Sequence, residues 1–127
     1  MAGLTYDAGA LVAGEANRAD VWALHRRALR HRLPITVPAV VYAQVWRDGA
    51  RQANLSRLLT GCVIEAFDEN TARAVGRALA VAGTSDVVDA AVVVGAASRG
   101  DLIITSDPND RARLVEALGA RVHLHTV

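Results

Sequence analysis

The stretch of residues 84–110 limits most strongly what this chain can fold into. Its segment 87–97 has the length of a helix and is apolar on nearly every side, so we expect a buried helix. Gly100 stands where a left-handed residue commonly ends a helix. Residues 102–105 then predict a short buried strand. A buried helix followed by a buried strand favours a domain in which helices cover a sheet.

The rest of the chain alternates strand and helix patterns in the same way. We expect further strands at residues 4–6, 35–37, 62–67 and 122–125. We expect further helices at residues 8–12, 17–32, 38–49, 51–59, 68–83 and 108–118. Strands separated by helices predict one α/β domain over residues 1–127, with a central and mainly parallel sheet flanked by helices.

Composition argues against several classes of protein. Apolar residues make up 52% of the chain and aromatic residues only 4%, so Ala, Val and Leu must fill the core. The 14 basic residues, all of them Arg, nearly balance the 13 acidic ones, which argues against a surface coated in positive charge. A single cysteine, Cys62, rules out an internal disulfide. The sequence has no leader and no long apolar run, so we expect a soluble, cytoplasmic protein without a membrane segment.

Acidic residues stand at the ends of the predicted apolar elements. Asp7 follows the first strand, and Asp107 follows the strand at residues 102–105. Asp89 lies about one turn into the buried helix, on the same face as Asp86. Ligands of parallel α/β sheets gather outside the carboxyl ends of the strands. We therefore expect at least three of these carboxylates to meet in one shallow pocket.

Carboxylates that lie this close repel one another, and a divalent cation relieves the repulsion. Oxygen ligands without a Cys or His cluster suit Mg²⁺ or Mn²⁺. Such a cation activates water and neutralises charge in phosphodiester hydrolysis. Thr105 and Ser106, beside Asp107, are placed to hydrogen-bond a carboxylate or a metal-bound water. The cluster thus predicts a site for metal-assisted hydrolysis of a phosphodiester.

Two of the four aspartates have a structural alternative. Asp86 would favour the helix N-terminus through the backbone dipole. Asp107 would act as the N-cap of the last helix, a role that is compatible with metal binding. Asp7 directly follows an apolar strand and Asp89 lies inside an apolar helix, so capping explains these two less readily.

Three motifs carry a resemblance to a known family. They are LTYDAGALV around Asp7, VVDAAVVVGAASRGD around Asp89 and IITSDPND around Asp107. Taken in this order and spacing, they make the chain similar to PIN-domain ribonucleases. More narrowly, the chain resembles the VapC-like toxin of a VapBC-type toxin–antitoxin pair. The resemblance covers essentially the whole chain.

The resemblance implies a PIN-like fold and the activity of a Mg²⁺- or Mn²⁺-dependent endoribonuclease. It implies that Asp7, Asp89 and Asp107 are the catalytic residues that hold the cation. Asp86 would be a further metal ligand, and Gln44 would support the site directly or through water. It also implies an RNA substrate, a homodimer and a cognate antitoxin protein as partners.

The chain departs from the family pattern at one position. The family usually has a Glu on the helix after the second strand, and here VPAVVYAQVWRDG places Gln44 there. Gln keeps an oxygen ligand but loses a charge, which weakens the affinity for a cation. A catalytically weak or inactive PIN-like domain that binds RNA or protein is therefore an alternative. A phosphoryl-transfer or receiver-type domain is a third, and it generally needs a Lys that this chain lacks.

Several large side chains near the predicted site have two interpretations. Four arginines are candidates either for phosphate contacts or for solvated surface charges: Arg47, Arg51, Arg111 and Arg113. Trp22 and Trp46 could stack on bases, but tryptophans at helical spacing among Val and Leu are more typical of a core or an interface.

Overall fold

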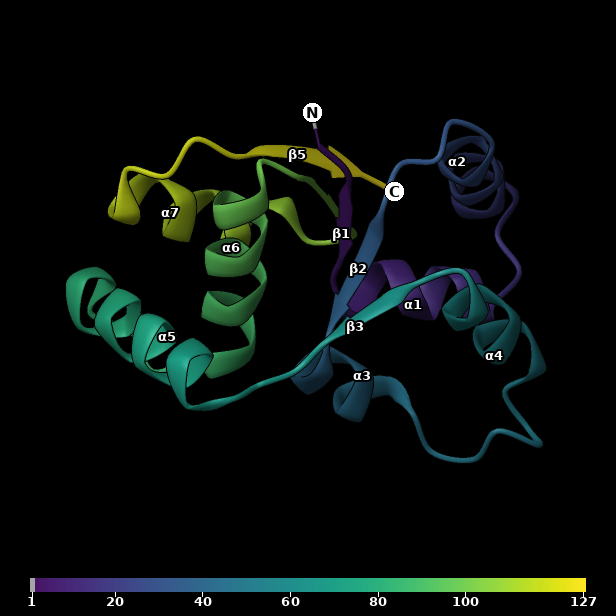
Figure 1. Cartoon of the computed structure of the whole chain (residues 1–127), viewed down its shortest axis with the longest axis horizontal. Helices are drawn as coiled ribbons and strands as arrows, with labels where there is room; N and C mark the ends of the chain where they lie inside the picture. The colour runs from purple at the N-terminus through teal and green to yellow at the C-terminus, as the bar shows by residue number, and fades with distance from the viewer. Residues whose placement is uncertain (1) are drawn as a thin grey trace.

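The computed structural model describes residues 2–127 and contains a five-stranded sheet in which every strand pair is parallel. The strand order is β3-β2-β1-β4-β5, so β1 lies at the centre (Figure 1). The strands are β1 (Leu4–Tyr6), β2 (Ile35–Pro38), β3 (Val63–Glu65), β4 (Leu102–Thr105) and β5 (His123–Thr126). The predicted α/β class with a central parallel sheet is confirmed.

Helices cover both faces of this sheet. They are α1 (Ala8–Glu15), α2 (Ala19–Arg30), α3 (Ala39–Val45), α4 (Ala53–Thr60), α5 (Glu69–Ala82), α6 (Val87–Arg99) and α7 (Pro108–Leu118). In Figure 1, α5, α6 and α7 lie on one side of the sheet, and α1, α2 and α4 lie on the other. Helix α6 contacts β1, β2 and β4, while α1 contacts β1 and β4 from the opposite face. The two central helices therefore enclose the middle of the sheet.

The helix predicted to be buried is the central helix α6. Its buried residues are Ala90, Ala91, Val92, Val93, Gly95 and Ala96, and Gly100 ends it at a φ of 72°. Within residues 2–127 no single helix is long and apolar enough to cross a membrane; only α5 and α6 together, bent by 107°, match a span by length and composition.

One charged network ties the last turn of α6 to the sheet. Arg99 donates hydrogen bonds to the Asp101 carboxylate (2.9 Å) and to the Thr5 hydroxyl (3.0 Å), and it forms an ion pair with Glu65. Thr5 in turn donates to Asp101 (2.8 Å). Because these partners come from β1, β3 and the start of β4, the network fixes where the C-terminal end of α6 sits on the sheet.

Three predicted boundaries were wrong. The first helix continues beyond residue 12 through Gly14, where a Cβ would lie 2.6 Å from Cδ2 of Leu58, so this glycine allows α4 to approach. The third helix ends at Val45 instead of near residue 49, because Gln52 Oε1 accepts hydrogen bonds from the Arg47 and Asp48 amides and holds them in a loop. The third strand spans only Val63–Glu65, at the edge of the sheet.

Tyr6, just before Asp7, belongs to a buried aromatic cluster on the α1 and α2 side. Its hydroxyl hydrogen-bonds Nδ1 of His25 at 2.9 Å, and Trp22 packs edge-on against the His25 ring. Trp22 donates from Nε1 to the Gly14 carbonyl at 3.0 Å and packs partly buried against the core, as the sequence indicated. Burial, and secondarily the charge of Arg26, lowers the pKa of His25 below its ordinary value of 6.5.

This cluster predicts acid sensitivity. A pKa that is lower in the folded chain contributes stability above about pH 6.5, and that stability is lost as the pH falls from 6.5 through the folded-state value. We expect the stability advantage of wild type over His25→Gln to shrink between about pH 7.5 and about pH 5.5. Urea denaturation of both proteins measures it, and other titrating groups cancel in the comparison. A constant difference across this range would contradict the prediction.

Candidate metal centre

Two of the predicted carboxylates share one guanidinium at the carboxyl edge of the sheet. Nη2 of Arg111 lies 3.4 Å from Oδ2 of Asp7, and Nη1 of Arg111 forms an ion pair with Oδ1 of Asp89. The side chains are 2% (Asp7), 18% (Asp89) and 9% (Arg111) exposed. Asp7 and Asp89, which are far apart in sequence, meet at this point, whereas the sequence predicted that at least three carboxylates would meet.

Asp7 is held by the end of β1 and the start of α1. Its amide donates to the Ile104 carbonyl (3.2 Å), and its Oδ1 accepts from the Ala10 amide (3.0 Å) as the N-cap of α1. Two residues after Asp7, the chain requires glycine at position 9, because a Cβ there would lie 1.9 Å from the Ser106 hydroxyl oxygen. This glycine lets the loop between β4 and α7 approach the start of α1.

Asp89 lies in the first turn of α6, where Asp86 is the N-cap. Oδ1 of Asp86 accepts a hydrogen bond from the Asp89 amide at 3.0 Å, so the capping interpretation of Asp86 holds. Burial raises the pKa of the Asp89 carboxyl to about 6; the charge of Arg111 works in the opposite direction, and Asp86 and Asp110 add to the rise. Desolvation and carboxylate repulsion therefore outweigh the ion pair at Asp89.

Asp107 lies apart from the bridge formed by Arg111. It is the exposed N-cap residue of α7, but its carboxylate makes no capping hydrogen bond. The Asp107 amide donates a hydrogen bond to the hydroxyl of Thr105 at 3.0 Å. Thr105 is buried, whereas Ser106 is exposed. Within residues 2–127 no three His, Cys, Asp or Glu side chains are grouped closely enough to hold a metal ion.

Gln44 is exposed on α3, a helix that contacts α6. Its neutral side chain adds no charge to the site. Gln44 remains a proposed supporting residue.

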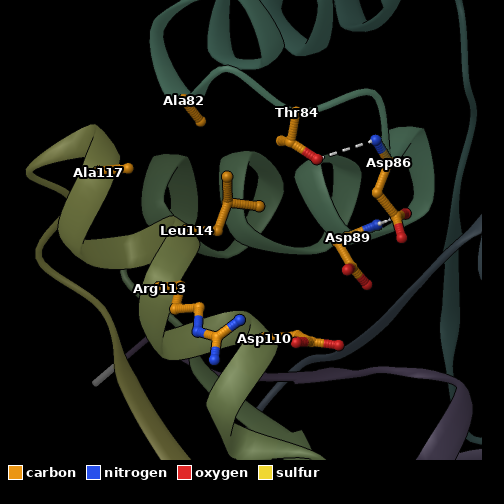
Figure 2. A pocket seen from close by; sticks show the side chains of 8 residues that line it. All are labelled: Ala82, Thr84, Asp86, Asp89, Asp110, Arg113, Leu114 and Ala117. Carbon is orange, nitrogen blue, oxygen red and sulfur yellow. Dashed lines mark hydrogen bonds between the residues drawn. The ribbon is translucent and has the colours of Figure 1, made fainter.

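A hollow of about 350 Å³ opens beside Asp89, between the end of α5, the start of α6 and α7. Figure 2 shows the three carboxylates of Asp86, Asp89 and Asp110 along one side of it, with Leu114 between the helices. Thr84, Arg113, Ala82 and Ala117 complete the lining. The site is thus an acidic edge with a partly apolar hollow next to it.

The sequence did not identify the role of Arg111, which was grouped with phosphate-binding or surface arginines. The structure buries it between two carboxylates, and its Nε has no hydrogen-bond partner. One signal was present. Arg111 stands at the end of the first turn of α7, where the helix dipole disfavours a cation, so a compensating negative charge was to be expected.

The chain matches no family model and no curated protein. It is similar in structure to a chain of VapBC2 from Rickettsia felis, solved bound to a DNA fragment from its promoter. That match has a TM-score of 0.72 and 14% identity, and it covers 98% of each chain. PAE2754 from Pyrobaculum aerophilum gives a TM-score of 0.58 and 20% identity, over 94% of this chain and 90% of that one. At these identities the matches show the fold, and they confirm the predicted PIN-like architecture.

The balance of charges at Asp89 leads to a prediction. In wild type its carboxyl titrates with a pKa of about 6. Replacing Arg111 by Met removes the neighbouring cation, so we expect the Asp89 pKa to rise by about one pH unit or more. Carboxyl-detected NMR titration measures both values. Arg113→Met, two residues along the same helix, should change the value less, and an unchanged pKa in Arg111→Met would refute the bridge.

Proposed function

We propose that this protein is a Mg²⁺- or Mn²⁺-dependent endoribonuclease and the toxin of a toxin–antitoxin pair. The observation that carries the proposal is the meeting of Asp7 and Asp89 against a single cation, the Arg111 guanidinium, at the carboxyl edge of the sheet. The structural likeness to a chain of VapBC2 supports the toxin–antitoxin part.

The donor chemistry of the site fits a hard divalent cation. Asp7 and Asp89 offer carboxylate oxygens that already attract a positive group, and the raised pKa of Asp89 marks a carboxylate in need of compensation. Asp107 and Asp86 would complete the ligand set directly or through water. When bound, Mg²⁺ or Mn²⁺ would supply an activated water and neutralise charge on the phosphate.

The remaining side chains position these ligands and receive the substrate. The Thr105 hydroxyl accepts a hydrogen bond from the Asp107 amide and so helps to fix the backbone position of Asp107. Arg47 and Arg51 are exposed on the loop after α3, and a phosphate would have to compete with the carbonyls that Arg47 binds and with Asp48 beside Arg51. Because a helical RNA duplex hides its base edges, single-stranded or looped RNA is the proposed substrate.

A second candidate is a catalytically weak or inactive domain that binds RNA or protein. Two observations favour it. Gln44 is neutral where the family has a charged ligand, and Asp107 does not join the Arg111 bridge. A Gln44→Glu variant separates the candidates, because a weakened enzyme gains activity from the added charge and a pure binding module does not.

We also propose that the protein forms a homodimer. Val12 on α1 and Leu29 on α2 are large apolar side chains that are 53% and 45% exposed, and they lie on helices that contact each other. Sedimentation analysis should give twice the chain mass of 13.4 kDa for wild type. Leu29→Arg should shift it toward monomer, and a wild-type protein that sediments as a monomer would rule the dimer out.

The nuclease proposal is tested with purified protein and a structured RNA, with and without Mn²⁺. We expect Mn²⁺-dependent cleavage that falls by about 100-fold or more in Asp7→Asn and in Asp89→Asn, because each change removes a ligand charge. Asp20→Asn, an exposed aspartate on α2 paired with Arg18, is the matched control and should cleave like wild type. If wild type cleaves the RNA no faster than the two site variants, the nuclease proposal is refuted.

A further inference from the structure

Arg111 links three parts of the fold through charge. It extends from α7 to Asp7 at the end of β1 and to Asp89 in α6, and its side chain is 9% exposed. Inside a protein, a guanidinium against two carboxylates is a strong interaction, since water screens it little. Arg111 is therefore the dominant positive charge at the proposed metal centre.

The position of Arg111 depends on those two carboxylates. Its Nε is buried without a partner, which costs free energy. Its place near the start of α7 is also unfavourable for a cation, because the helix dipole is positive there. Weakening the pull of Asp7 and Asp89 would therefore release the guanidinium.

A second cation cannot bind the same carboxylates without conflict. Oδ2 of Asp7 and Oδ1 of Asp89 face Arg111, and a divalent ion using these groups would sit close to the guanidinium and repel it. The hollow of about 350 Å³ beside Asp89 is lined by two further carboxylates, Asp86 and Asp110, and their charge would attract a displaced guanidinium. The surroundings thus allow one cation to replace the other.

We propose that Arg111 is the resident counter-ion of the Asp7–Asp89 pair, and that a divalent cation binds this pair only by displacing the Arg111 guanidinium. The inference rests on the proposed function, because it requires that the pair bind a metal. It adds that the chain's own side chain competes with the metal and sets the affinity of the site. The guanidinium offsets one of the two carboxylate charges, whereas a divalent cation would offset both.

The first test measures Mn²⁺ binding by isothermal titration calorimetry. We expect Arg111→Met to bind Mn²⁺ about tenfold more tightly than wild type, a difference of about 1.4 kcal/mol, because the competing cation is gone. Arg121→Met removes the same charge from an exposed position beyond the C-terminal end of α7, so its affinity should change by less than about threefold. Asp89→Asn should abolish binding in both the wild-type and the Arg111→Met backgrounds.

The second test uses the wild-type protein, so it holds even if Arg111→Met fails to fold. Titration with diamagnetic Mg²⁺ is followed by the NMR signal of the Arg111 Nε–H group. We expect this signal to shift and its proton to exchange faster with water as the guanidinium leaves its buried position. A signal that stays unchanged while Mg²⁺ binds would overturn the displacement.

The outcomes separate this inference from the proposed function. If wild type and Arg111→Met bind Mn²⁺ with equal affinity and Asp89→Asn does not bind it, the counter-ion proposal is wrong and the proposed metal site is supported. A folded Arg111→Met that binds Mn²⁺ more weakly than wild type would overturn the counter-ion proposal too, since Arg111 would then be positioning the ligands. If wild type and Arg111→Met both fail to bind Mn²⁺, the metal site itself fails, and the inference fails with it.

Discussion

The close packing of α6 on the centre of the sheet is the constraint on which the rest of the structure depends. Small and medium-sized side chains allow it, since the buried face of α6 is built from Ala, Val and Gly95. The Arg99 network holds the C-terminal end of the helix against β1 and β3. With that end fixed, the first turn of α6 falls beside the end of β1, and this places Asp89 next to Asp7. The geometry of the site is therefore a consequence of how the core packs.

That placement has an electrostatic cost, which the site itself reduces. Burial disfavours the ionised form of Asp89, and Asp86 and Asp110 repel it further. Arg111 offsets part of this cost for Asp7 and Asp89 together, at the expense of an unpartnered Nε. The ion pairs with Arg111 therefore reduce, but do not remove, the repulsion among these carboxylates. Such arrangements are expected where a site is kept for chemistry or binding.

The features that the sequence predicted correctly are those with local signals. The apolar run of α6, its end at Gly100 and the capping by Asp86 each follow from a few neighbouring residues. The features it missed depend on side-chain contacts that no local sequence pattern signals. The end of α3 is set by Gln52, which bonds amides several residues earlier, and the course of α1 through Gly14 is set by Leu58 in another helix. Arg111 belongs to the same class, since its partners are more than 20 residues away in the chain. The meeting of Asp7 and Asp89 was predictable only because a general rule of parallel sheets replaces the missing contact information.

The acidic edge also has a structural reason that is independent of catalysis. In an all-parallel sheet the helices that follow β1 and β4 start at the same edge, and α6 starts there as well, so three helix N-termini converge. Each carries a partial positive charge and free amides, which favour Asp. Asp7 and Asp86 use this by accepting amide hydrogen bonds, whereas the Asp107 carboxylate does not. Capping therefore accounts for part of the cluster, and Asp89 and Asp107 are the residues whose carboxylates it leaves unexplained. For the same reason Asn is the informative replacement at Asp7. Asn keeps an oxygen that can accept from the Ala10 amide, so a loss of activity would report the lost charge. Ala would also remove the helix cap, which typically contributes about 1 kcal/mol.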